Sequence, residues 1–168
     1  MSIKWIGCGL IFLACLALAS EGCGILRRRE RCLTELDGLL TAFLGEIRFG
    51  MQPLPVLLER MGERPSGGGF QAAAEELSKR DGRSAGECFR AGVGGSYPEL
   101  TKEDRQVLLA LGEGLGSCDR ETQCRQIEAV QDRLRTQQLA ARERRAKNTR
   151  LYWGLGILGG LFLVLLLM

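Results

Sequence analysis

The sequence of 168 residues contains no histidine. This absence excludes Ser-His-Asp and Cys-His catalysis, and it excludes metal sites with histidine ligands. Aromatic residues make up only 6% of the chain, which disfavours a module that binds nucleic acid by base stacking. The 4 prolines are too few for a linker protein, and the 26% of charged residues are too mixed in sign for a disordered chain.

Charge is also absent from two long apolar runs, at residues 5–19 and 151–168. About twenty residues of helix cross the core of a bilayer, and somewhat fewer are enough where aromatic residues such as Tyr152 and Trp153 anchor the end of the run. We therefore predict an N-terminal transmembrane helix over residues 1–26 and a C-terminal one over 151–168.

The first apolar run has a second interpretation as a cleaved export signal, because Ala17-Leu18-Ala19 resembles a signal-peptidase site. The flanking charge argues against it, since cations stay on the cytoplasmic side of membrane segments. Both basic clusters lie on the inner side of the apolar runs, as Arg27, Arg28, Arg29 and Arg31 and as Arg142, Arg144, Arg145, Lys147 and Arg150. We expect residues 27–150 to form a cytoplasmic domain, with both termini outside.

The two basic clusters account for the positive charge of the chain. They carry +3 and +4 after Glu30 and Glu143 are counted, and the whole chain carries +3, so the remainder carries −4. Contact with anionic lipid headgroups is the simplest use of such clusters, worth about 1 kcal/mol for each cation near the surface. A nucleic-acid surface is the weaker interpretation, because topology already requires cations at these positions.

Between the clusters, apolar residues recur three and four positions apart, which is typical of amphipathic helices. A long first helix presents Leu33, Leu36, Leu40, Phe43 and Ile47, and we expect it to end at Gly50 as a left-handed cap. A long last helix from about residue 117 presents Cys124, Ile127, Val130 and Leu134 and runs on toward the second apolar run. No stretch has the alternation or the β-branched content of a strand.

Four shorter helices are expected between these two. They open at Pro53 or Leu54, at Phe70 after a flexible loop over 65–69, at Ser84 with a capping box to Glu87, and at Thr101 with a capping box to Asp104. Asp81-Gly82, Gly94-Gly95 and residues 112–116 are expected to end the last three of them. The predicted fold is all-α, an antiparallel bundle of about six helices with both basic clusters at one end and the connecting loops at the other.

Other motifs do not indicate chemistry. Gly154, Gly156 and Gly159 spell GxGxxG, but they lie inside an apolar run, without the strand and acidic residue of a dinucleotide site. The glycine-rich residues 112–116 lack the lysine of a phosphate loop. The 7 cysteines form no CxxC pair and are interpreted as small hydrophobic residues in a reducing cytoplasm. We predict no cofactor, no metal and no enzymatic activity.

Three segments carry a resemblance to a known family. They are EIRFGMQPLPVLLERM at residues 46–61, LGEGLGSCDRETQCRQI at 111–127 and AKNTRLYWGLGILGGLFLVLLLM at 146–168. Together with the chain length and the first apolar run, they resemble the stage III sporulation protein AB family of endospore-forming bacteria over nearly the whole chain.

The resemblance implies a fold related to the cytoplasmic domains of type II secretion F proteins. It implies a place in the mother-cell membrane around the forespore, in the channel between the two cells, among other channel membrane proteins. It also implies a neighbouring secretion-type ATPase, stage III sporulation protein AA, as a partner. A non-enzymatic assembly platform is therefore the expected function. A generic secretion F-type assembly protein, a membrane-bound carboxylate-dependent enzyme and an exported domain stay open as alternatives.

The two turns within the matching segments are the expected partner surface. The candidate residues are Glu46, Arg48, Gly50, Pro53 and Leu54 in the first turn, and Gly112, Glu113, Leu115, Gly116 and Asp119 in the second. The glycines have a structural explanation as helix caps, and the proline and leucines have one as helix start and core. Among the ten, Glu46, Arg48 and Glu113 are favoured for contact with a partner.

Overall fold

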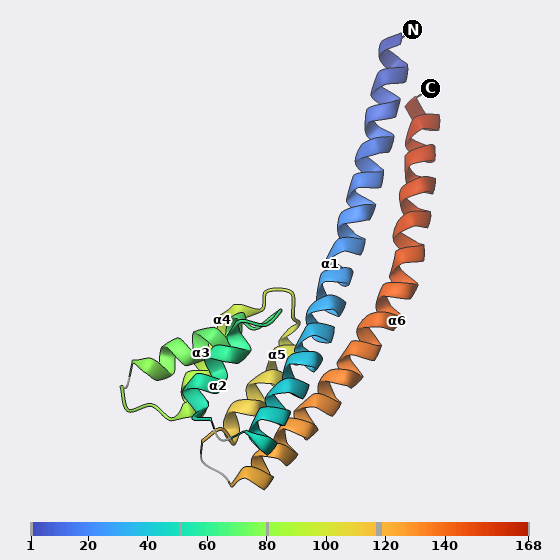
Figure 1. The fold of residues 1–168 in the computed structure, drawn as a ribbon. Helices are drawn as coiled ribbons and strands as arrows, with labels where there is room; N and C mark the ends of the chain where they lie inside the picture. The colour runs from blue at the N-terminus through green and yellow to red at the C-terminus, as the bar shows by residue number, and fades with distance from the viewer. Residues whose placement is uncertain (1, 51, 80, 117–118, 168) are drawn as a thin grey trace. The chain divides into compact units, whose positions relative to one another are not determined.

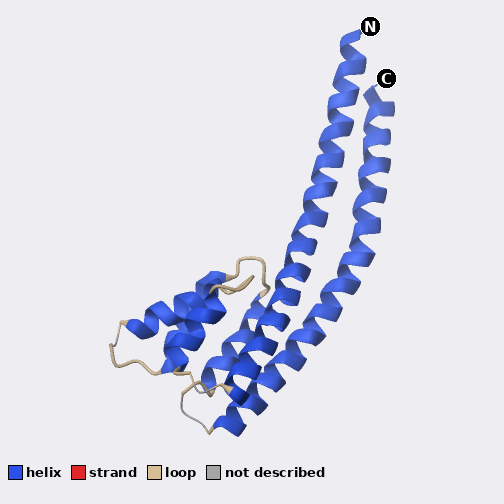
Figure 2. Cartoon of the chain, viewed as in Figure 1, coloured by secondary structure: helices blue, strands red, loops and turns tan. Residues whose placement is uncertain are grey.

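The computed structural model describes residues 2–50, 52–79, 81–116 and 119–167, with only part of the side chains near the two ends. Within this part of the chain there are six α-helices, one 3₁₀ turn and no strand, which confirms the all-α prediction. The elements are α1 (Ser2–Phe49), α2 (Leu54–Gly62), α3 (Gly68–Ser78), α4 (Ala85–Ser96), α5 (Lys102–Leu109), η1 (Ala110–Glu113) and α6 (Arg120–Leu167) (Figure 1, Figure 2).

The chain divides into two compact units. One comprises Met1–Glu30 with Ala140–Met168, called the terminal unit below, and the other comprises Arg31–Leu139, called the helical body. By hydropathy, none of the helices contains, within the described residues, a stretch apolar enough to count as a membrane span. The two transmembrane helices and the boundaries at residues 26 and 151 therefore stay predictions.

The core of the helical body is built on one face of α1. Leu33, Leu36, Leu40 and Phe43 are fully buried there, and Ile47 is nearly so, as the periodicity predicted. Phe43 meets Phe70 of α3 edge to face at 5.6 Å between ring centroids, and Phe70 meets Phe89 of α4 in the same way at 5.2 Å. Three segments far apart in sequence are thereby joined by one aromatic stack.

A second face of α1 pairs with α6 through polar side chains, called the polar seam below. Thr34 accepts a hydrogen bond from Gln138 at 2.6 Å, Asp37 pairs with Arg135 at 3.0 Å, and Thr41 accepts from Gln131 at 2.6 Å. Residue numbers rise on one helix as they fall on the other, so the two helices run antiparallel within the helical body.

Two of the short helices, α4 and α5, begin where side chains cap them. Ser84 and Glu87 form the predicted capping box at the start of α4, and Thr101 and Asp104 form the one at the start of α5. α3 and α4 cross closely at Gly92, where a Cβ atom would lie 2.3 Å from the backbone nitrogen of Ala73. The capping boxes thus determine where α4 and α5 begin, and the close crossing at Gly92 determines how α3 and α4 pack.

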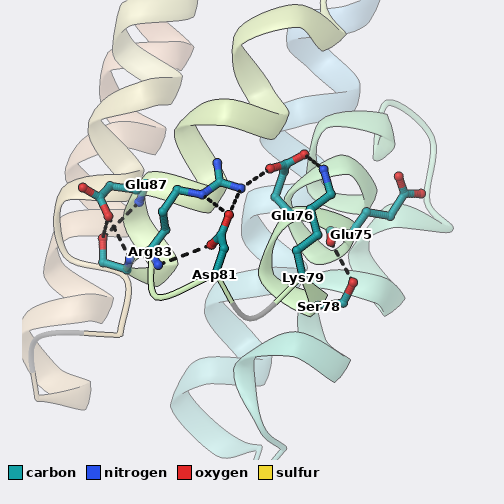
Figure 3. Close-up of polar contacts among 8 residues, drawn as sticks. Glu75, Glu76, Ser78, Lys79, Asp81, Arg83 and Glu87 are labelled. Atoms are coloured by element: carbon teal, nitrogen blue, oxygen red, sulfur yellow. Dashed lines mark hydrogen bonds and ion pairs between the residues drawn. The ribbon is translucent and has the colours of Figure 1, made fainter.

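The loop between α3 and α4 turns at Gly82, whose φ of 82° lies in the left-handed region. Figure 3 shows Arg83 between two carboxylates, Glu76 at 2.5 Å and Asp81 at 2.6 Å. Lys79 makes a further ion pair with Glu76. Because hydrogen bonds from Arg83 and Lys79 stabilise the charged forms, the pKa values of Asp81 and Glu76 are lowered.

The differences from the prediction include three helix boundaries and one helix cap. The predicted loop at 65–69 is shorter, because Gly68 and Gly69 already belong to α3. The bare backbone of Gly69 leaves room for the ring of Tyr97, whose hydroxyl accepts a hydrogen bond from the Gly69 N–H at 3.3 Å. Gly94-Gly95 does not end α4, which continues to Ser96 and thereby brings Tyr97 to its hydrogen bond with the Ser66 carbonyl at 2.7 Å.

The other two differences concern Gly50 and the start of α6. Gly50 follows α1 and its N–H donates to the Glu46 carbonyl at 2.8 Å, but its φ is not left-handed. α6 begins at Arg120 instead of about residue 117, because Asp119 caps it by accepting a hydrogen bond from the Thr122 N–H at 3.1 Å.

Candidate functional site

The two predicted turns come together around one cleft of the helical body, called the end cleft below. Its volume is about 320 Å³, and it is bordered by the end of α1, the start of α2 and the start of α6. Its lining residues are Glu46, Ile47, Gly50, Gln52, Leu54, Leu57, Gly116, Arg120 and Gln123. Four residues predicted for partner contact, Glu46, Gly50, Leu54 and Gly116, therefore share a surface although up to seventy positions separate them.

Local chemistry shapes the rim of the end cleft. Pro53 stands immediately before α2 in an extended conformation, with φ −60° and ψ 144°, so the chain leaves α1 and re-enters a helix within a few residues. Gly116 has φ 80°, a left-handed conformation that side chains rarely adopt. Gln123 donates a hydrogen bond to the Gly114 carbonyl at 3.2 Å, which ties the second turn to α6.

The floor of the end cleft is apolar and its rim is polar. Ile47 and Leu57 are buried and Leu54 is half-buried, whereas Gln52 and Arg120 are exposed. Glu46 faces Arg60 of α2 at 3.3 Å. An apolar floor with a charged rim is the usual anatomy of a surface that receives a protein partner.

A second cleft, called the arginine cleft below, lies beside the first. It has a volume of about 410 Å³ and is lined by Arg48, Arg120, Glu121, Cys124, Arg125 and Glu128. Arg48 donates a hydrogen bond to Glu128 at 2.5 Å, which raises the pKa of its guanidinium and keeps it charged. Arg125 pairs with Glu121 at 3.1 Å. Arg120 lines both clefts, so the two meet at its side chain.

The remaining predicted contact residues have different positions. Gly112 and Leu115 lie in the interior, and a Cβ atom on Gly112 would meet the Gly86 carbonyl oxygen at 2.9 Å. Pro53, Glu113 and Asp119 are exposed but do not line either cleft. Gly112 is thus explained by the close approach of η1 to α4.

Sequence reasoning missed Phe49 and Arg120. Phe49, the last residue of α1, is 82% exposed, the largest exposure among the large apolar side chains that are described. Its position off the buried stripe of α1 could have indicated an outward-facing aromatic residue. Arg120 gave no such signal, because its place between the clefts depends on the antiparallel pairing of α1 and α6.

Apart from Arg31, the predicted basic residues belong to the terminal unit. Glu30 of α1 pairs with Arg145 at 2.7 Å and with Arg142 at 3.3 Å on α6. Arg29 is buried, whereas the side chains of Arg27, Arg28, Arg142, Arg144 and Lys147 are exposed. Arg31 belongs to the helical body, where it pairs with Glu35 at 2.8 Å, and the side chain of Arg150 lies outside the described residues.

The cysteines that the structure describes are free thiols. Cys32, Cys88 and Cys124 are buried and Cys23 is half-buried, while Cys118 and the side chains of Cys8 and Cys15 lie outside what the structure describes. Burial raises the pKa of the Cys32 thiol to about 11, which keeps it protonated and unreactive. Within the described part of the chain, no cluster of three or more cysteine or acidic side chains is placed to hold a metal ion.

Comparison with known proteins identifies the family. The sequence model of stage III sporulation protein AB matches residues 4–168. The chain belongs to the stage III sporulation protein AB family. The family member from Bacillus subtilis (strain 168) is 29% identical over 171 residues, which cover 99% of each chain. A solved structure of stage III sporulation protein AB has a TM-score of 0.63 and 24% identity, covering 70% of this chain and 96% of that one, and it supports the fold.

Proposed function

We propose that this chain is a non-enzymatic platform in the mother-cell membrane around the forespore, needed for endospore formation, and that it docks a secretion-type ATPase. Membership of a sporulation family supports the setting. The observation that carries the docking role is the end cleft, because it gathers the two turns that carry the family resemblance into one surface. The exposed Phe49 stands next in the chain to Arg48 at this end of α1, and exposed aromatic and arginine residues are frequent anchors of protein interfaces.

The terminal unit supports the membrane part of the proposal. Successive helical residues lie about 100° apart around the axis. The exposed Arg27 and Arg28 therefore project to different sides of α1, and Arg142 and Arg144 to different sides of α6. A collar of cations around both helices suits a membrane surface, whereas a nucleic acid would favour cations on one face.

The first test is co-purification of the full chain with stage III sporulation protein AA, the ATPase implied by the family resemblance, with and without nucleotide. We expect a complex whose yield depends on nucleotide, because a motor that works on a platform changes its contacts through the cycle.

A second test adds protease from outside to intact sporulating cells. We expect residues 31–139 to survive, and their digestion within a sealed envelope would contradict the cytoplasmic orientation.

A charge swap separates docking from folding. In Arg48→Glu, two carboxylates face each other across the arginine cleft, while the double variant with Glu128→Arg restores an ion pair of opposite direction. If Arg48 contacts the partner, both variants form few heat-resistant spores, although the membrane contains normal amounts of the double variant. Full recovery of spore formation in the double variant would mean that Arg48 serves only its pair with Glu128.

A further inference from the structure

The two clefts that meet at Arg120 form a surface with three arginines and an apolar floor. Arg48, Arg120 and Arg125 border it, and Ile47 and Leu57 lie beneath the end cleft. Each cleft has the volume of a small binding pocket, so side chains of a partner fit inside it.

The three arginines of the surface differ in the ion pairs that they already make. Within the described part of the chain, Arg48 pairs with Glu128 and Arg125 with Glu121, whereas Arg120 has no ion pair. Arg125 and Glu121 are 69% and 80% exposed, and exposed pairs of this kind contribute only about 0.2–1 kcal/mol. An incoming carboxylate can therefore bind Arg120 directly and replace Glu121 on Arg125 at small cost.

The glutamates at the rim restrict the partner further. Glu46, Glu121 and Glu128 stand among the arginines, so closely spaced phosphates of a nucleic acid or polyphosphate would be repelled at several points. Isolated carboxylates can reach the arginines and avoid these glutamates. The apolar floor adds a preference for an aliphatic side chain beside the carboxylate.

We propose that the surface centred on Arg120 binds an acidic segment of the docked partner, in which carboxylates alternate with aliphatic residues. Its carboxylates bind Arg120 and Arg125, and an aliphatic side chain rests on Leu54, Ile47 and Leu57. This proposal rests on the proposed docking function, for which it names the chemistry of the contact.

The test measures binding of a short fluorescein-labelled peptide of alternating glutamate and leucine to the full chain in nanodiscs of phosphatidylcholine. Empty nanodiscs and a peptide with glutamine in place of glutamate are the controls. Arg120→Gln is expected to weaken binding about tenfold, the effect of losing a hydrogen bond between charged groups. Arg133→Gln is the matched control, because Arg133 is exposed on the same helix and lines neither cleft.

Three results would overturn the proposal. They are equal binding of the glutamine peptide, unchanged binding by Arg120→Gln, and displacement of the peptide by inorganic polyphosphate at lower concentration than by unlabelled peptide. Binding that does not saturate by about 1 mM peptide also counts against it. If the ATPase co-purifies but the peptide fails, the platform function stands without this contact. If the peptide binds through Arg120 but the ATPase does not co-purify, the acidic partner is another protein.

Discussion

The two inner faces of α1 within the helical body have opposite chemistry. One carries an apolar stripe that is buried, with Phe43 against the ring of Phe70, and the other carries Thr34, Asp37 and Thr41 in hydrogen bonds and ion pairs to α6. Burial of an aromatic side chain contributes far more to stability than a polar contact at a surface. The aromatic stack should therefore determine how stable the body is, and the polar seam should determine how α1 and α6 align.

Polar partners suit the seam to the task of aligning the two helices. Two helices that meet only through apolar residues lose little stability when one slides along the other. Hydrogen-bonded side chains, in contrast, meet their partners in one register only. Gln131 is 5% exposed, so a shifted register would leave its amide buried without a partner.

Replacing the central aromatic ring should cost most. Phe70→Ala removes both edge-to-face contacts and leaves a cavity, so we expect a loss of about 3–5 kcal/mol in the free energy of unfolding. Thermal unfolding of the full chain in mild detergent, followed by near-ultraviolet circular dichroism, measures it. Phe49→Ala is the matched control, since that ring is 82% exposed and its loss should change stability little. Equal losses of stability in the two variants would show that the aromatic stack does not determine the stability of the helical body.

Close backbone packing should come next. A Cβ atom at Gly86 would lie 1.9 Å from the carbonyl oxygen of Gly112, so Gly86→Ala must push η1 away from α4. We expect a loss of about 1–3 kcal/mol. Gly94→Ala on the same helix meets no atom within 4 Å and should be neutral or stabilise by up to about 1 kcal/mol. The same melting experiment compares the two variants. If Gly86→Ala were as stable as Gly94→Ala, η1 could move away from α4 without a loss of stability.

The seam should tolerate an apolar replacement. In Gln131→Leu the Thr41 hydroxyl still donates to the Asp37 carbonyl at 2.9 Å, so no buried group is left unpaired there. We expect a loss of about 0.5–1.5 kcal/mol. The register is measured by the distance between spin labels at Gly38 and Asp132, which are both exposed positions. The distribution of this distance should broaden in the variant. A loss of stability as large as that of Phe70→Ala would contradict the division of roles between the two faces.

Features that depend on neighbours in sequence were predictable. The stripe at Leu33, Leu36, Leu40, Phe43 and Ile47 is buried throughout because helical periodicity alone places these residues on one face. The capping boxes at α4 and α5 were found because each needs only two side chains three positions apart. The family resemblance also pointed to the two turns that meet at the end cleft.

Features that depend on neighbours in space were not predictable. Glycine was interpreted as a helix terminator at Gly94-Gly95, but the helix continues because packing around Tyr97 favours it. Gly112 was interpreted as part of a contact surface, but it lies against Gly86 in the interior. Arg120 entered the site only through the pairing of α1 with α6, which periodicity does not locate residue by residue.

The ion pairs around Arg83 should have the smallest effect, because they lie at the surface, where solvent screens them (Figure 3). Both carboxylates have a lowered pKa, so their contribution to stability is present above their ordinary pKa and is lost as the pH falls through the lowered value. Arg83→Gln should raise the pKa of Asp81 toward its ordinary value, because Arg83 is the main cause of its shift. The pKa of Glu76 should rise less, because Lys79 remains.

Nuclear magnetic resonance titration of the two carboxyl carbons measures this difference, with Arg90→Gln as an exposed control on α4 that should leave both pKa values unchanged. A larger rise at Glu76 than at Asp81 would mean that Arg83, and not Lys79, is the main partner of Glu76. If Arg83→Gln lowered the melting temperature at pH 7 as much as Gln131→Leu does, an exposed pair would equal a buried seam contact. Burial would then not explain why the polar contacts between α1 and α6 contribute more to stability than ion pairs at the surface.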